Sequence, residues 1–114
     1  MTRQEDPSAP SVIPVRLTAS SAEHRIKELA KETDRIIWSE HALERMYERG
    51  IPDFQVLEIL RTGMVFEAPE KTEHGEWKCK IVKEIRGRRS AGVVTIFLHN
   101  ARLFLMTVEW EDTR

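Results

Sequence analysis

Two apolar runs near the C-terminus constrain the fold more than any other feature of this sequence. They extend over Val93–Leu98 and Leu103–Val108, and only four residues separate them. Nearly continuous apolar runs are typical of central strands that are covered on both faces. The interval around Asn100–Arg102 is short enough for a hairpin. The sequence therefore predicts two neighbouring antiparallel strands in the interior of a sheet.

Further strands are predicted on either side of two helices. From Trp77 to Ile85 the apolar residues stand mostly at alternate positions, which indicates a strand with one buried face. Shorter apolar segments at Ile36–Trp38 and Met64–Phe66 predict two more strands. Most of the strands are therefore expected after the helices.

The two predicted helices are short and follow one another directly. The first lies between Ser39, a good N-cap residue, and Gly50, which readily ends a helix. The second begins at Pro52 and ends near Gly63. The buried face of the first helix is expected to comprise Ala42, Leu43, Met46 and Tyr47, and that of the second Phe54, Val56, Leu57 and Leu60.

The N-terminal residues have a different character. Residues 1–19 contain three of the five prolines and little that could be buried, so we expect a flexible tail. A helix is predicted over residues 20–34, with Ser20 and Glu23 forming a capping box. Its apolar stripe is narrow and comprises Ala22, Ile26, Leu29 and Ala30. This helix is therefore expected to pack at the edge of the domain or against a partner.

The order of these elements predicts an α+β fold. We expect residues 35–114 to form a β-α-α-β-β-β core, in which helices pack on one face of a mainly antiparallel sheet. The N-terminal helix is an addition to this core. A chain of 114 residues suits one compact domain.

Composition excludes several classes of protein. The 18 Lys and Arg residues nearly balance 19 Asp and Glu residues, and a net charge of −1 argues against a uniformly cationic coat for nucleic acid. A single cysteine, Cys79, excludes an intramolecular disulfide and favours a reducing, cytoplasmic location. The apolar runs are too short for a membrane span, and residues 1–16 lack the apolar core of a signal peptide.

The helix predicted after Ser39 carries a column of nitrogen-bearing side chains. His41, Arg45 and Arg49 are spaced four residues apart, so they form one slanted column that borders the apolar face and should be partly sheltered. Like charges at this spacing cost about 0.2–0.5 kcal/mol per pair, so helix stability does not explain the arrangement. One interpretation is an anion-facing stripe with a titratable imidazole. The other is structural, with Arg45 paired to Glu48.

A second basic segment lies further along the chain. Its six cationic residues, set against the single acidic residue Glu84, are Lys78, Lys80, Lys83, Arg86, Arg88 and Arg89. Alternation along a strand places Lys78 and Lys80 on the face opposite Cys79. This face, extended by the turn at Arg86–Arg89, is favourable to a phosphate backbone. The alternative is a solvated strand and turn whose lysines discourage edge-to-edge pairing.

The remaining reactive side chains give weaker signals. No two of the four histidines have a metal-ligand spacing, so neither a metal site nor a cofactor is expected. Of the other histidines, His99 at a strand end is the best candidate for a second imidazole. Cys79 alternates with apolar residues and is interpreted as a core residue. The three tryptophans could offer stacking planes, but tryptophan in a small domain usually fills the core.

One stretch of the sequence resembles a known family. The segment Ile37–Ile51, IWSEHALERMYERGI, followed by the Val56–Leu60 helix and Gly63, resembles the signature of the bacterial "domain of unknown function 4258" family. The resemblance extends more weakly through the strands and covers about residues 35–110. That family is commonly grouped with RelE- and BrnT-type toxins, which share a small α+β ribonuclease-like fold. The implied core agrees with the order of elements above.

The resemblance implies metal-independent cleavage of RNA, in which the ribose 2′-hydroxyl attacks the adjacent phosphate. Such a site needs a base, cations that stabilise the developing charge, and an acid for the leaving 5′-oxygen. His41 is then the base or the acid, and Arg45 and Arg49 stabilise the phosphate. The RNA backbone would be held by Lys78, Lys80, Arg86, Arg88 and Arg89.

Two alternatives to this toxin-like endoribonuclease remain open. The same surface could belong to a non-catalytic module that binds RNA or an acidic protein partner. The chain could also be a dimeric accessory domain whose N-terminal helix docks onto a second copy. The nuclease hypothesis implies RNA, with or without the ribosome, and an antitoxin protein as partners.

Overall fold

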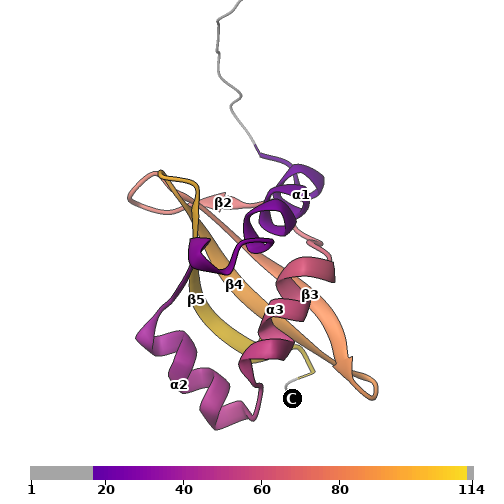
Figure 1. Cartoon of the computed structure of the whole chain (residues 1–114). Helices are drawn as coiled ribbons and strands as arrows, with labels where there is room; N and C mark the ends of the chain where they lie inside the picture. The colour runs from indigo at the N-terminus through magenta and orange to yellow at the C-terminus, as the bar shows by residue number, and fades with distance from the viewer. Residues whose placement is uncertain (1–16, 113–114) are drawn as a thin grey trace, which may run out of the picture.

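The sheet of the computed structural model, which describes residues 17–112, has five strands in the order β1-β5-β4-β3-β2 (Figure 1). The strands are β1 (Ile36–Trp38), β2 (Glu70–Lys71), β3 (Trp77–Arg86), β4 (Arg89–Leu98) and β5 (Arg102–Trp110). β1 runs parallel to β5, and all other neighbours are antiparallel. The predicted α+β class and the hairpin between the two apolar runs are confirmed. The tail predicted over residues 1–19 lies, as far as residue 16, outside the described residues.

Three α-helices pack on one face of this sheet. They are α1 (Ala19–Ala30), α2 (Glu40–Arg49) and α3 (Asp53–Thr62), with a short 3-10 turn, η2 (Thr33–Arg35), after α1. Figure 1 shows α1 and α3 in front of the sheet and α2 beside β5. The buried strand residues on the helix-covered face are Ile36, Cys79, Ile81, Ala91, Val93, Thr95, Phe97, Leu103, Leu105, Val108 and Trp110.

The opposite face, called here the open face, is not covered by these helices. Val94, Ile96 and Phe104 lie on it and are only half-buried. The prediction that the two apolar runs are covered on both faces is therefore wrong. A sheet with all its helices on one side leaves the alternate residues of even its central strands in partial contact with water.

The ends of α2 agree with the sequence prediction, but its buried face does not. The Ser39 hydroxyl accepts a hydrogen bond from the Ala42 N–H at 3.0 Å, and Gly50 ends the helix with φ +68°. Ala42 and Met46 are buried, whereas Leu43 and Tyr47 are 49% and 89% exposed. Because α2 packs mainly against β5, only a narrow arc of the helix is covered.

The face that α3 buries also differs from the prediction. Val56, Ile59 and Leu60 are fully buried and Leu57 packs at their edge, but Phe54 is 65% exposed. Two helical positions correspond to a rotation of about 200°, so a side chain two residues from Val56 points away from the core. The prediction for Phe54 was wrong because it rested on apolar character without this geometry.

The N-terminal helix belongs to the same core. α1 begins after Thr18, whose hydroxyl accepts from Ser21 N–H at 3.0 Å, and ends at Ala30 rather than near residue 34. Its residues Ala22, Ile26 and Ala30 are fully buried, and α1 packs against α3 of its own chain. The apolar stripe of this helix is therefore covered by its own chain.

Glu23 does not form the predicted capping box with Ser20. Its carboxylate accepts hydrogen bonds from the Val65 backbone N–H at 2.9 Å and from Lys27 Nζ at 3.0 Å. The bond from Val65 and the bond from Lys27 hold the pKa of Glu23 below its ordinary value. Glu23 therefore ties α1 to the segment that follows α3.

That following segment is less regular than predicted. Instead of a strand over Met64–Phe66, only Met64 forms a bridge, exchanging two 2.9 Å backbone hydrogen bonds with Val82 of β3. The chain then leaves β3 and returns to it at β2.

Substitution of Gly63 is expected to test how tightly α3 abuts β3. A Cβ at this position would lie 2.6 Å from the Ile59 carbonyl oxygen and 2.7 Å from that of Val82, both backbone atoms. Gly63→Ala should therefore lower the free energy of unfolding in urea by about 3 kcal/mol. Gly50→Ala has open space and only a left-handed φ to accommodate, so it should cost about 1 kcal/mol. Equal losses would contradict the close packing at Gly63.

Truncation of Ile26 is expected to show that α1 is part of the cooperative unit. Ile26→Ala removes a fully buried side chain and should lower the free energy of unfolding by about 3 kcal/mol in one transition. The half-exposed Leu43 is the matched control, and Leu43→Ala should change stability by less than about 0.5 kcal/mol. An unchanged free energy of unfolding in Ile26→Ala would contradict the conclusion that α1 is part of the cooperative unit.

Candidate functional site

The His41, Arg45 and Arg49 column lies on α2, and its arginines are engaged within the chain. Arg45 forms an ion pair with Glu48, and its Nε lies 3.4 Å from His41 Nε2. Arg49 Nη1 donates to the Val108 carbonyl at 3.2 Å. The two arginines are half-buried as expected, but His41 is exposed, contrary to the expected shelter. The predicted Arg45–Glu48 pair is confirmed.

The turn between β3 and β4 carries a group of arginines that we call the arginine surface: Arg86, Arg88 and Arg89. The guanidinium carbons of Arg89 and Arg86 lie 3.9 and 5.4 Å from the centroid of the Trp110 ring. Trp110 is buried, and its Nε1 donates to the Arg49 carbonyl at 3.1 Å. The tryptophan thus joins the turn to the C-terminal end of α2, and it fills the core rather than offering a free stacking plane.

Two arginines of this surface are held by further hydrogen bonds. Arg86 Nη2 donates to the Gly50 carbonyl at 3.0 Å and to Gln55 Oε1 at 2.7 Å. Arg89 donates to both oxygens of Asp112 at 2.9 and 3.2 Å. Arg88 is exposed at the tip of the turn. With one carboxylate against three guanidinium groups, the arginine surface has an excess of positive charge.

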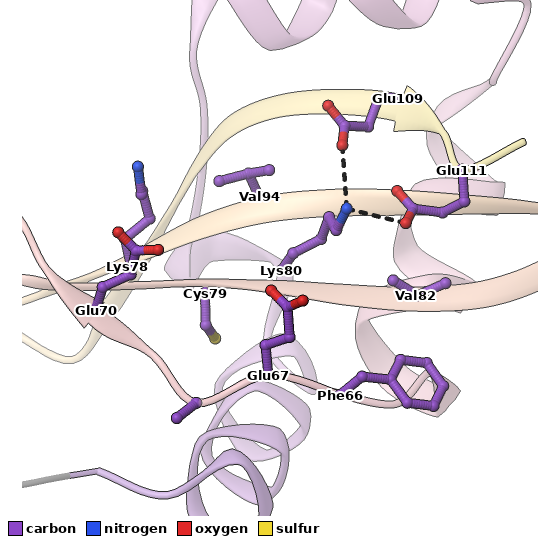
Figure 2. Close-up of a pocket in the computed structure, with 11 residues that line it drawn as sticks. Phe66, Glu67, Glu70, Lys78, Cys79, Lys80, Val82, Val94, Glu109 and Glu111 are labelled. Carbon is purple, nitrogen blue, oxygen red and sulfur yellow. Dashed lines mark hydrogen bonds and ion pairs between the residues drawn. The ribbon is translucent and has the colours of Figure 1, made fainter. Parts of the chain in front are cut away.

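Lys78 and Lys80 lie elsewhere, on the open face. They line a hollow of about 280 Å³ that we call the acidic hollow (Figure 2). Its carboxylates come from Glu67, Glu70, Glu109 and Glu111, and its apolar lining includes Phe66, Val82 and Val94. The five predicted RNA-contacting residues therefore form two separate groups, and only the turn arginines lie in positive surroundings.

Lys80 sits between two carboxylates of the acidic hollow. Its Nζ lies 3.3 Å from Glu109 Oε2 and 2.9 Å from Glu111 Oε1, as Figure 2 shows. Burial by itself lowers the pKa of Lys80, but the hydrogen bonds to Glu111 and Glu109 outweigh it and the net shift is upward from 10.5. Lys80 is therefore an ammonium ion at neutral pH and is not a nucleophile.

Glu111 is placed by a close approach to the backbone of β4. Its N–H donates to the Ser90 carbonyl at 2.8 Å, and a Cβ on Gly92 would lie 2.7 Å from Glu111 Oε2. A side chain at position 92 would therefore displace this carboxylate. Within residues 17–112, Glu111 Oε2 is the buried side-chain oxygen that lacks a hydrogen-bond partner.

The acidic hollow arises because the segment between Met64 and Glu70 has more residues than the part of β3 that it passes. Met64 is bridged to Val82, and Glu70 pairs with Lys78. Five residues of the connecting segment therefore pass three residues of β3, so the segment arches away from the strand. Glu67 lies on this arch and faces Lys80 across the hollow (Figure 2).

Sequence reasoning missed the four carboxylates of the hollow as site residues. Two signals were present: residues 64–77 contain four glutamates against one lysine, and Glu109 and Glu111 alternate with the buried Val108 and Trp110. Alternation alone places Glu109 and Glu111 on the open face. Their distance to Lys80 depends on the register between β3, β4 and β5.

The other candidate residues have structural or peripheral positions. Cys79 is buried, and its burial raises the pKa of the thiol above 9.0 while a contact to Thr95 opposes the shift, so it is a core residue as predicted. His99 is exposed at the end of β4 opposite to the arginine surface. In residues 17–112, no three potential ligands are grouped to hold a metal ion, and no helix is long and apolar enough to cross a membrane.

These features define a small α+β domain with an open sheet face and two oppositely charged surfaces. The chain belongs to the DUF4258 family (domain of unknown function), whose model matches residues 38–110. No curated protein and no solved structure matches the chain in the same comparisons. The match begins at the end of β1, so α1 lies outside it although α1 contributes to the core.

Removal of Lys80 is expected to lower stability by an amount that depends on pH. In Lys80→Met, the carboxylates of Glu109 and Glu111 face each other without the ammonium ion, which opposes folding. The loss of unfolding free energy relative to the wild type should be about 1 kcal/mol at pH 7, because the pair is partly exposed. Because the pKa of Lys80 is raised above 10.5 in the folded protein, this advantage of the wild type is present below pH 10.5 and is lost at higher pH as Lys80 gives up its proton. Urea titrations at pH 7 and at about pH 11.5 measure this difference. For Lys78→Met we expect no such difference, and a deficit of Lys80→Met that is equal at both pH values would contradict the arrangement.

Proposed function

We propose that this domain binds RNA through the arginine surface. The observation that carries the proposal is the grouping of Arg86 and Arg89 on the Trp110 ring, with Arg88 beside them at the tip of the turn. Guanidinium groups that are already held in place lose little side-chain freedom when they bind phosphate oxygens. The arginine surface therefore suits a phosphate backbone better than scattered lysines would.

Exposed aromatic residues close to this surface favour single-stranded RNA. Arg86 bonds to Gly50 and Gln55, which lie three residues after Tyr47 and next to Phe54. Tyr47 is 89% and Phe54 65% exposed, so both rings are open to a ligand. Unpaired bases stack on such rings, so a single strand of RNA could contact the arginines and the aromatic side chains together.

The acidic hollow does not suit RNA. Its four carboxylates exceed its two ammonium groups, so it repels a phosphate backbone. Lys78 and Lys80 are therefore left out of the proposed RNA contact, and the binding surface consists of the turn arginines.

Reversal of one charge on the arginine surface is expected to weaken RNA binding. Arg88→Glu should raise the Kd for a fluorescent single-stranded 12-nucleotide RNA about tenfold near 0.1 M salt and should make the dependence of log K on log salt shallower. Fluorescence anisotropy at several salt concentrations measures both quantities.

Lys31→Glu is the matched control for this measurement. Lys31 is exposed after α1 and changes the net charge by the same amount. Equal losses in Arg88→Glu and Lys31→Glu would reject the arginine surface as the binding site.

A toxin-like endoribonuclease is the second candidate function, in line with the resemblance to RelE- and BrnT-type toxins. The specific observation in its favour is that His41 is open to solvent and lies beside the Arg45 guanidinium. An imidazole next to a cation provides two of the groups that 2′-hydroxyl attack requires. Arg45 and Arg49 would have to leave Glu48 and Val108, at least in part, to reach a phosphate.

Cleavage is tested with the same RNA in EDTA, alone and on ribosomes. On the nuclease hypothesis, His41→Ala should lower the cleavage rate about 100-fold or more, and Arg45→Ala should lower it as well. His74→Ala, at another exposed histidine, should cleave at the wild-type rate. Undiminished activity in His41→Ala and Arg45→Ala would remove the assigned site, and the absence of product under all conditions would leave the binding module.

A further inference from the structure

We propose that the acidic hollow is a docking site for a protein partner and that it receives an arginine or lysine side chain of that partner. The proposal concerns the open face and not the arginine surface, and it does not depend on RNA binding. Figure 2 shows the hollow between the arch of residues 66–70 and the strands β3 to β5.

Charge is the first argument for a basic occupant. Glu67, Glu70, Glu109 and Glu111 surround the hollow, and Lys78 and Lys80 offset only half of their charge. Lys80 is shared between Glu109 and Glu111, whereas Glu67 and Glu70 stand on the opposite wall. One further cation that enters between the walls would lower the remaining charge of the hollow from −2 to −1.

The exposed carboxylates of the hollow are the second argument. Glu111 Oε2 lies against Gly92 and is closed to solvent, so an entering cation does not reach it. Glu67 and Glu70 also line the hollow and are exposed. A guanidinium has five N–H donors in a planar fork, so it can bind such a carboxylate through two hydrogen bonds.

Size and surroundings favour a side chain of a protein over a free small molecule. The hollow is small, about 280 Å³, and is flanked by exposed apolar side chains. Phe66, at the rim, is 67% exposed, and Met64 beside Val82 is 53% exposed. A partner segment that inserts one basic residue would cover these two apolar side chains, which a polyamine would leave in water.

The experiment uses the full chain labelled with ¹⁵N and follows backbone amides by NMR. The probe is acetyl-Leu-Arg-Leu-amide, and the uncharged control replaces arginine with citrulline. We expect saturable shifts at Glu67, Lys80 and Glu111 with the arginine peptide, and none with the citrulline peptide. Shifts spread evenly over the acidic residues of α2 and α3, or equal binding of the citrulline peptide, would overturn the proposal.

Two pairs of variants separate the hollow from general charge. Glu67→Gln with Glu70→Gln should raise the Kd of the arginine peptide about fivefold. Glu44→Gln with Glu58→Gln removes the same charge from exposed helix positions and should leave the Kd unchanged. Equal effects of the two pairs would overturn the proposal.

Two further measurements are needed. One compares a protein with a polyamine as the source of the cation, and the other separates peptide binding from RNA binding. Spermidine should bind more weakly than the arginine peptide because it cannot cover Phe66 and Met64, and tighter binding of spermidine would reject a protein partner. Arg88→Glu should leave peptide binding unchanged. If the protein binds the peptide but not RNA, the proposed function is rejected and this inference stands. If it binds RNA but not the peptide, only this inference is rejected.

Discussion

Burial of one face of the sheet beneath the helices is the interaction on which the rest of the molecule depends. Ile81, Val93 and Leu105 lose all contact with water there, and Ile26 of α1 and Ile59 of α3 are equally buried. Apolar area removed from water is the dominant favourable contribution to folding. Because the helices lie on one side only, the other side of the sheet remains open and is free to carry charged side chains.

The charged side chains of the sheet lie where the helices do not cover it. Alternation along β3 and β5 sends Lys80 and Glu109 to the open face, where ion pairs stay partly hydrated and cost little to maintain. The turn between β3 and β4 extends past the core, and Arg86 and Arg89 lie over the ring of Trp110. The nearly neutral net charge of the chain therefore conceals a positive turn and an acidic hollow.

Contacts between residues close together in the sequence could be predicted, whereas contacts between distant residues could not. The Arg45–Glu48 pair could be predicted because three helical residues span less than one turn. The ion pairs of Lys80 join residues 29 and 31 positions apart, and the grouping of Arg86 with Gly50 and Gln55 joins two helices and a strand. Spacing along the chain carries no information about such contacts, so the basic segment was predicted as one surface although its members lie in two.

The sequence by itself determined the features that local chemistry controls: the Ser39 cap, the left-handed Gly50, the hairpin after Leu98, the alternation of β3 and membership of the family over residues 38–110. Only the tertiary structure decided which apolar residues are buried and which charges meet. Phe54 and Tyr47 are apolar but exposed, because burial depends on what packs against a helix and not on the helix alone. Caps and turns involve neighbours in the chain, whereas packing and ion pairs on a sheet require register between distant segments.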